Sequence, residues 1–81
     1  MRYFFDLTEG DQVALDNEGI DFPSVEMAQQ EAALSLANLA RDLVLTNGRN
    51  GVSHCMAIHV RDTNGPVLKA HFVFEIGRAD H

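Results

Sequence analysis

With 81 residues, the chain has room for one small domain, and it carries a net charge of −6 from twelve acidic and six basic residues. Nucleic-acid binding through phosphate contacts needs clustered lysine and arginine, so this composition argues against nucleic acid and suits a basic protein partner. A domain of this size buries only about 60–65% of its unfolded surface, and self-association is a common source of added stability. The single cysteine, Cys55, excludes an internal disulfide.

The N-terminal residues and the lengths of the apolar runs indicate the cellular location of the protein. MRYFFDLTEGDQ turns acidic within six positions and contains no apolar signal-peptide core. The longest apolar runs are too short to cross a membrane. We therefore expect a cytoplasmic protein with no membrane partner, built as one domain over residues 1–81 in which 77–81 form a frayed tail.

Two short strands are predicted at the start of the chain. Residues 2–8 alternate apolar and polar side chains, as in a strand with one buried face, and Val13 and Leu15 continue the alternation on a second strand. Pairing Leu7 with Val13 leaves residues 9–11 as the hairpin loop. The side chains expected to point inward are Tyr3, Phe5, Leu7, Val13 and Leu15, followed by Ile20 and Phe22.

Residues 24–46 are predicted to form the one long helix of the chain. Good helix formers dominate, no glycine or proline interrupts them, Ser24 is a favoured N-cap, and Asn47-Gly48 supplies a stop. At about 100° per residue the apolar side chains fall in one arc that can cover a sheet. Gln29 lies in the middle of this arc, where we expect a buried amide bonded to backbone. The arc comprises Val25, Ala28, Ala32, Ala33, Leu36, Leu39, Ala40, Leu43 and Val44.

A second group of apolar residues, Met27, Leu34 and Leu45, lies on the opposite side of the helix, where polar side chains should face water. One interpretation is that they are isolated exposed residues, which are normal on protein surfaces. The other is that they form a contact surface for a second copy or another protein, since a chain this small cannot cover both sides of a helix. The sequence leaves both interpretations open.

Two further strands are predicted after a loop rich in glycine and asparagine over residues 47–53. Residues 55–61 and 67–76 both alternate, and facing side chains of an antiparallel pair must point to the same side. The register that meets this condition leaves a loop over 63–65, with Gly65 where a three-residue hairpin needs positive φ. It pairs Val60 with Leu68, Ile58 with Ala70 and Met56 with Phe72.

The predicted architecture is α+β, in the order β-β-α-β-β, with an antiparallel sheet and one long helix packed on one of its faces. The face away from the helix, here called the open face, collects polar and aromatic side chains. The predicted register places His59 opposite Lys69 and Ala57 opposite His71, so the two histidines are diagonal neighbours. The open-face residues of interest are Phe4, Asp6, His59, Arg61, Lys69 and His71.

The open face admits three interpretations. Two histidines and a carboxylate could bind a metal or move protons, although Lys69 would repel a cation. The simplest interpretation is an ordinary polar sheet face, and the third is a recognition surface. No phosphate-binding loop, dinucleotide fingerprint, zinc-binding pair or nucleophile motif is present, and the acidic turn over 16–21 lacks ligands where a calcium loop needs them. We therefore predict no cofactor, no metal and no catalytic residue, with Cys55 a structural thiol.

Several short motifs resemble a known family. The opening Arg2-Tyr3-Phe4-Phe5, followed by Leu7 and Gly10, is similar to the short bacterial domain-of-unknown-function proteins that begin RYFFHL-x-D-G. The likeness covers nearly the whole chain, and Asp6 stands where that family often carries histidine, which weakens a metal site on the first strand. The resemblance supports the fold and carries no assigned activity. Its further matches are Asp16, Glu18-Gly19, Phe22-Pro23 and Val60-x-Asp62 before Gly65.

A second resemblance is to the HicB-type antitoxins, whose N-terminal domains are small sheet-plus-helix folds that bind a basic toxin. These proteins place an Ala-rich helix after an acidic turn and an aromatic-Pro step. Glu18-Gly19, Phe22-Pro23 and Glu31-Ala32 match that arrangement loosely. The resemblance implies a small basic protein as the partner.

Three functional hypotheses follow from the sequence. The first is a non-enzymatic protein-interaction module, homodimeric through Met27, Leu34 and Leu45 or through a sheet edge. The second is an antitoxin-like partner of a small basic protein. The third is a small metal-dependent catalyst that uses His59 and His71. We favour the first, because no motif for catalysis is present.

Overall fold

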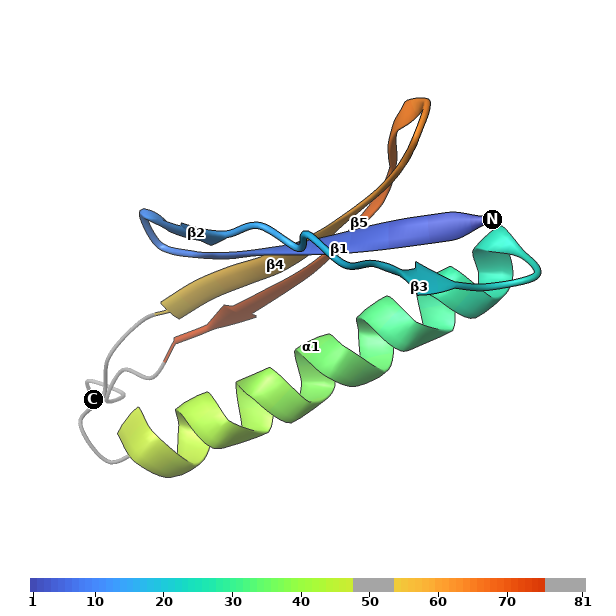
Figure 1. Ribbon diagram of the computed structural model, residues 1–81. Coiled ribbons are helices and arrows are strands. Elements are labelled where there is room, and N and C mark those ends of the chain that lie inside the picture. Colours follow the sequence, from blue (N-terminus) through green and yellow to red (C-terminus); the bar gives the residue numbers. More distant parts are fainter. Residues whose placement is uncertain (48–53, 76–81) are drawn as a thin grey trace, which may run out of the picture.

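The structure is a computed structural model that describes residues 1–47 and 54–75, and it confirms the α+β class (Figure 1). An antiparallel sheet carries one long helix packed on one face. The predicted loop residues 48–53 and the predicted tail lie outside the described residues. The elements are β1 (Arg2–Glu9), β2 (Gln12–Ala14), β3 (Ile20–Asp21), α1 (Val25–Asn47), β4 (His54–Asp62) and β5 (Gly65–Phe74).

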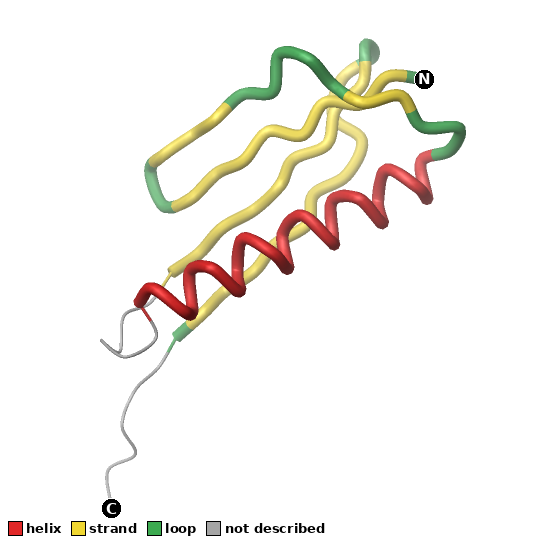
Figure 2. Tube along the Cα trace, turned by 60° about the horizontal axis from the view of Figure 1, so that its bottom comes forward, coloured by secondary structure: helices red, strands yellow, loops and turns green. Residues whose placement is uncertain are grey.

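The sheet is organised around β1 and β4, which pair with each other in the strand order β2-β1-β4-β5. The sequence did not indicate β3, a two-residue strand that pairs with the start of β1 while β2 pairs with its end. Both lie on the side of β1 away from β4, as Figure 2 shows, and the β1–β2 hairpin extends beyond the cover of α1. At the other side of the sheet, β5 is the outermost strand.

Helix α1 starts where the sequence predicts, because the Ser24 hydroxyl accepts the Met27 N–H at 3.3 Å and caps the first turn. Its buried face is narrower than the predicted arc. Gln29 is exposed, which corrects the expected buried amide, and Val25, Ala33 and Val44 are exposed as well. For Ala33 the reason is position, because α1 packs on β4 and β5 and Ala33 lies beside the outer strand β5. The helix residues that are buried are Ala28, Ala32, Leu36, Ala40 and Leu43.

The core between helix and sheet is built from the predicted inward faces of the long strands. Met56, Ile58 and Val60 of β4 are almost completely buried, and Tyr3 of β1 joins them. Phe22 packs onto this core after β3, with its ring centroid 6.5 Å from that of Tyr3 and 6.1 Å from that of Phe5. The core is therefore closed at the N-terminal end of α1 by aromatic side chains.

The first hairpin differs from the prediction by one residue. Leu7 pairs with Ala14 and Thr8 with Val13, so the loop is the two residues Gly10 and Asp11 rather than 9–11. Gly10 has φ 56° and occupies the first central position of the turn, where two-residue hairpins favour glycine. Because a one-residue slip moves every side chain to the other face, the hydrophobic side chains expected inside point outward. Val13 and Leu15 are exposed in consequence. Ile20 of β3 is also exposed, although it pairs with the buried Tyr3 and therefore faces the helix side of the sheet.

The second hairpin has the predicted register along most of its length. All three predicted pairs from Met56 to Val60 are confirmed. Near the tip the register shifts by one between Val60 and Arg61, so Asp62 pairs with Gly65 and the loop shortens to residues 63–64. Gly65 has φ 125°, the positive value expected for it.

Candidate protein-interaction surface and the polar sheet face

An ion-pair network joins β1, β4 and the segment after β2 on the open face. Asp6 of β1 is buried, and its carboxylate accepts hydrogen bonds from Arg61 Nε at 2.8 Å and Arg61 Nη2 at 3.4 Å. The same carboxylate accepts the Asp16 N–H at 2.9 Å, and Arg61 Nη2 also donates to the Asp16 carbonyl at 2.9 Å. The Arg61 guanidinium lies 4.6 Å from the centroid of the Phe4 ring, which adds a cation–π contact. Arg61 therefore ties β4 to β1 and to the segment that follows β2.

Asp16 bonds to the edge of β1 opposite β4, between the residues that pair with β2 and those that pair with β3. Its carboxylate accepts the Phe5 N–H at 3.1 Å, in the gap on β1 between β2 and β3. The same side chain accepts the Glu18 and Gly19 N–H groups at 3.0 and 3.1 Å. Gly19 has φ 73°, and a Cβ atom there would lie 2.9 Å from the Tyr3 carbonyl oxygen, so only glycine fits. These contacts fix the turn between β2 and β3 against β1.

The two carboxylates of this network have lowered pKa values. The hydrogen bond from Arg61 lowers the pKa of Asp6 and outweighs the opposing effect of burial. For Asp16, burial acts to raise the pKa, but the N–H groups of Phe5, Gly19 and Glu18 and the charge of Arg61 together lower it. Asp6 in turn raises the pKa of Arg61. Both carboxylates are therefore ionised acceptors with structural partners at neutral pH.

The two histidines of the open face interact with different neighbours. His59 Nε2 lies 3.4 Å from the Thr8 hydroxyl on β1, whereas His71 Nε2 lies 3.6 Å from the Cys55 sulfur on β4. Cys55 is an exposed free thiol on this face. Within residues 1–47 and 54–75, no group of three or more His, Cys, Asp or Glu side chains is arranged to hold a metal ion.

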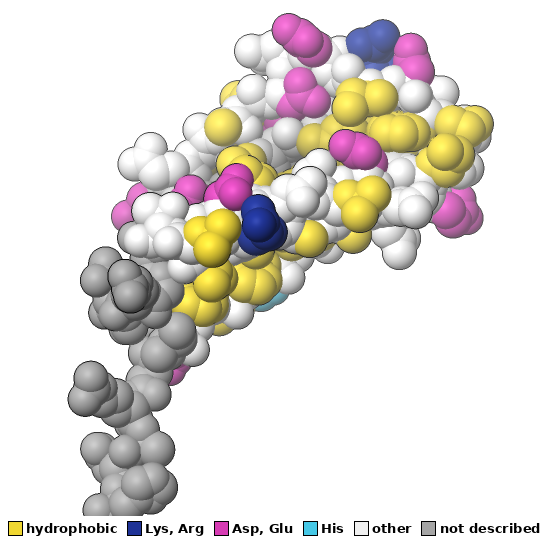
Figure 3. Space-filling model, turned by 90° about the horizontal axis from the view of Figure 1, so that it is seen from below, with side chains coloured by type: hydrophobic (Ala, Val, Ile, Leu, Met, Phe, Trp, Pro, Cys, Tyr) yellow, Lys and Arg dark blue, Asp and Glu magenta, His cyan; other side chains and the backbone are white. Residues whose placement is uncertain are grey.

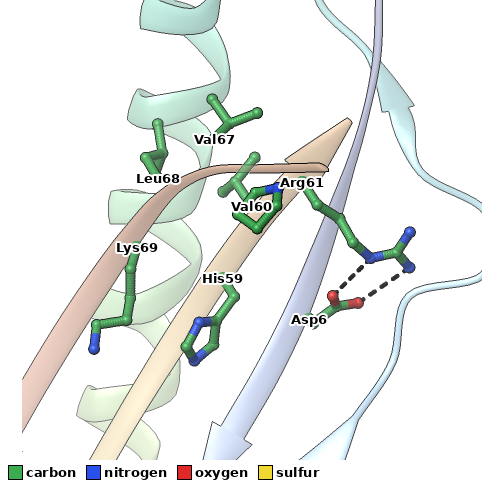
Figure 4. Close-up of a pocket in the computed structure, with 8 residues that line it drawn as sticks. Asp6, His59, Val60, Arg61, Val67, Leu68 and Lys69 are labelled. Atoms are coloured by element: carbon green, nitrogen blue, oxygen red, sulfur yellow. Dashed lines mark hydrogen bonds and ion pairs between the residues drawn. The ribbon is translucent and has the colours of Figure 1, made fainter. Parts of the chain in front are cut away.

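A shallow depression of about 390 Å³ lies beside the Asp6–Arg61 pair (Figure 4). Figure 4 shows Arg61 turned toward Asp6, while His59 and Lys69 lie next to each other on β4 and β5. Val67 and Leu68 form its other rim at the bulge near the hairpin tip. The structure thus brings together all the predicted open-face residues except His71, which lies further along β5.

A larger and more apolar groove lies between α1 and the outer side of β5. It has a volume of about 470 Å³ and is here called the β5 groove. Alanines dominate its helix wall, because Ala33 and Ala37 lie past the edge of the sheet where no strand covers them. Among the described strands, none pairs with the outer edge of β5. The lining residues are Ala33, Leu36, Ala37, Ala40, Ala70, His71 and Phe72.

The predicted helix stripe is exposed, with Met27, Leu34 and Leu45 at 45%, 56% and 67% exposure. Its members are widely separated, since the 18 residues from Met27 to Leu45 correspond to about 27 Å along the helix axis. Seen from the helix side, hydrophobic side chains form separate groups along and beside α1, with polar side chains between them (Figure 3). The stripe is thus a row of single apolar residues rather than a continuous patch.

The comparisons with known proteins place the chain in one family. Residues 2–73 match the family described as Domain of unknown function (DUF6894). The chain belongs to this family. No curated protein and no solved structure matches the chain significantly.

Membership in the DUF6894 family agrees with the resemblance to a domain of unknown function and covers most of the chain. The likeness to HicB-type antitoxins, and with it the basic partner, stays a prediction. The described part of the chain contains no helix that is both long and apolar enough to span a membrane.

Sequence reasoning missed two features that the structure brings out. The role of Asp16 was hidden because its carboxylate accepts backbone N–H groups, from Phe5 of β1 and from Glu18 and Gly19 of the turn, which no side-chain pattern reports. The β5 groove was missed because Ala33 was assigned to the buried arc and Ala37 was given no role. Their spacing of four residues is a signal for close packing of another element, but it does not say which element.

Proposed function

We propose that the chain is a non-enzymatic protein-interaction module that acts as a homodimer, and that the two copies join through the free edge of β5 and the β5 groove. The observation that carries this proposal is the coincidence of an outer edge of β5, with which no described strand pairs, and an apolar groove along the same strand. An edge strand presents unsatisfied N–H and C=O groups that can pair with another strand. An apolar groove beside it supplies contacts for side chains of that added strand.

The protection of β5 is confined to one end of the strand. Pro66 and the register shift near Val67 interrupt pairing at the hairpin tip, as natural edge strands often do. The remainder, residues 68–74, contains no proline and only one charged side chain, Lys69. Half-buried Phe72 and Phe74, stacked with ring centroids 6.5 Å apart, lie on the helix side of this segment. This part of β5 is therefore suited to pairing with another strand.

The open face supports a structural role better than a catalytic one. Asp6 and Arg61 are hydrogen-bonded to each other and to Asp16, so their charges already stabilise the contact between these parts of the fold. His59 and His71 have separate neighbours on β1 and β4. General acid–base or metal chemistry needs such groups directed at one common point.

The helix stripe is the competing surface for self-association. Met27, Leu34 and Leu45 lie on the side of α1 opposite the core, and Gln30, Asn38 and Arg41 separate them. A stable interface generally has a contiguous apolar centre within a polar rim. The β5 groove has such a centre, and we therefore assign the contact between copies to β5.

The test is the mass in solution by multi-angle light scattering or sedimentation, with two matched glutamate variants. Both Ala37→Glu in the β5 groove and Leu34→Glu in the helix stripe change exposed helix residues, so neither disturbs the core. We expect the wild-type chain to be dimeric, Ala37→Glu to be monomeric and Leu34→Glu to remain dimeric. If Leu34→Glu alone dissociates the dimer, the contact lies on the helix stripe, and a wild-type monomer at about 100 μM overturns the homodimer.

A further inference from the structure

We infer that the two copies join by antiparallel pairing of β5 with β5 about a twofold axis at Phe72, with Lys69 of each copy opposite the partner's Glu75. This inference rests on the proposed function, because it names the occupant of the β5 edge and the register that it adopts. It follows from three properties of β5: its face pattern, its charges and its position under α1.

Symmetry limits the possible registers. A twofold axis perpendicular to the sheet keeps both helices on the same face, and facing residues then share a face. Residues that face each other must therefore both be odd or both be even in number, so the axis passes through a residue of β5. A twofold axis can pass through Ala70, His71, Phe72 or Val73, which lie within the proline-free residues 68–74.

Only a twofold axis at Phe72 places the charged side chains of Lys69 and Glu75 opposite each other. Lys69 and Glu75 are the charged residues of this part of the chain, and both are exposed on the open face. With the axis at Phe72, each Lys69 faces the partner's Glu75, which gives two opposite-charge pairs in the dimer. With the axis at Ala70, Lys69 faces the partner's His71, and with the axis at His71 it faces the partner's Val73. Neither of those registers has an opposite charge beside the lysine.

The same register also fits large side chains to small ones on the helix side. Ala70 lines the β5 groove and leaves space beside α1. With the axis at Phe72, the partner's Phe74 lies opposite Ala70, where its ring can enter the groove. With the axis at Val73, Phe72 would instead meet the partner's Phe74 twice in the dimer, whereas the axis at Phe72 brings only the two Phe72 rings together. The axis at His71 also places a large ring, Phe72, opposite Ala70. The groove therefore disfavours the axis at Val73, and the charges decide between His71 and Phe72.

The helices of the two copies can then meet without a gap. Neighbouring strands lie about 4.8 Å apart, and α1 packs on both β4 and β5, so its axis lies about half a strand spacing inside β5. The two helix axes are then about 10 Å apart, which is the ordinary distance for packed helices. Ala33 and Ala37 lie on the side of α1 that faces the second helix, and their small side chains permit this approach.

The contact is smaller than that of a standard stable dimer. With the axis at Phe72 the pairing joins residues 69–75, which span about 23 Å, and one strand layer with one helix layer is about 20 Å deep. A strip of these dimensions covers about 460 Å² per protomer, compared with roughly 800 Å² in a standard interface, so we expect a weak dimer. Both the backbone pairing and the helix contact contribute to this surface.

Disulfide cross-linking in a Cys55→Ser background tests the register. His71 and Val73 are exposed on the open face, and the axis at Phe72 places His71 opposite the partner's Val73. Facing Cβ atoms lie about 4.5–5.5 Å apart, close enough for a disulfide after small adjustment. Co-expressed His71→Cys and Val73→Cys chains should form a linked heterodimer, whereas either variant alone should not. Self-linking of His71→Cys or of Val73→Cys would place the axis at that residue and overturn the inference.

A charge exchange gives a second measurement on the same register. Lys69→Glu and Glu75→Lys each set two like-charge pairs across the dimer and should raise the dimer dissociation constant by about tenfold. The double variant, Lys69→Glu with Glu75→Lys, should return it to within about twofold of wild type. If the dimer forms through β5 but neither the cross-link nor this rescue is seen, the register is wrong and the proposed function stands. A wild-type monomer would instead overturn both.

Discussion

Replacing Asp6 by asparagine tests the reasoning about the open-face network. Asparagine keeps the size of the side chain but removes the charge that Arg61 Nε and Nη2 contact at 2.8 and 3.4 Å. A hydrogen bond to a charged group contributes about 1.5–3 kcal/mol and a neutral one about 0.5–1.5 kcal/mol. Because the Asp6 side chain is 12% exposed while that of Arg61 is 38% exposed, water screens the pair partly. We expect a loss of about 1–2 kcal/mol in the free energy of unfolding at pH 7.

The effect of Asp6→Asn should depend on pH in a defined direction. The native pKa of Asp6 is lowered, so its ionised form stabilises the fold above the unfolded pKa of about 3.9. This stability is lost as the pH falls through the lower native value. Urea unfolding of wild type and variant should therefore differ at pH 7 and converge in strongly acidic solution.

Asp21→Asn is the matched control, since its ion pair with Arg2 at 3.1 Å is on the surface with both side chains largely exposed. It should change the free energy of unfolding by less than about 0.5 kcal/mol. Comparisons need one protein concentration, because self-association would add to the measured stability. Equal stability of Asp6→Asn and wild type at pH 7, or an equal difference at pH 7 and in acid, would refute the assignment.

Five further variants, two of them controls, probe the turn and the core by thermal unfolding and hydrogen exchange. Asp16→Ala removes the acceptor for three N–H groups and should lower the free energy of unfolding by about 1–3 kcal/mol. Faster hydrogen exchange at the Phe5 amide would identify the lost bond as the cause. Gly19→Ala should cost more than Gly10→Ala, because both have positive φ but only the Cβ at 19 collides with backbone. An equal loss at the two glycines would contradict the packing of the turn on β1. Ala32→Leu should cost about 1–3 kcal/mol because Ala32 is fully buried, while Ala33→Leu on the exposed side should leave the monomer fold nearly unchanged.

The parts of the fold that follow from local pattern were predictable. The helix is specified by its composition, by the Ser24 cap and by its apolar period, and these act within a few residues of chain. The β4–β5 register follows from alternation together with Gly65, because the two strands are neighbours in sequence. The open-face residues could be assigned to one side of the sheet for the same reason, although their ion pairs could not.

The first hairpin shows where such reasoning stops. The two possible loops, 9–11 and 10–11, differ by one residue and both contain Gly10, so local turn chemistry does not separate them. The difference is decided by how β1 meets β4 and by the bonds of Asp16 to β1, which join distant parts of the chain. Val13 and Leu15 face outward as a consequence.

The amino-acid sequence by itself determined the helix, the long strands with their inward faces and the helix start, because short-range sterics and periodicity govern these. Only the tertiary structure decided that Arg61 joins Asp6 and Asp16, that β5 is an outer strand and that Ala33 and Ala37 lie beside it uncovered. An outer strand and a central one can carry the same alternation, since strand order depends on long-range pairing and burial. The surface on which the proposed function depends is therefore a property of the assembled sheet.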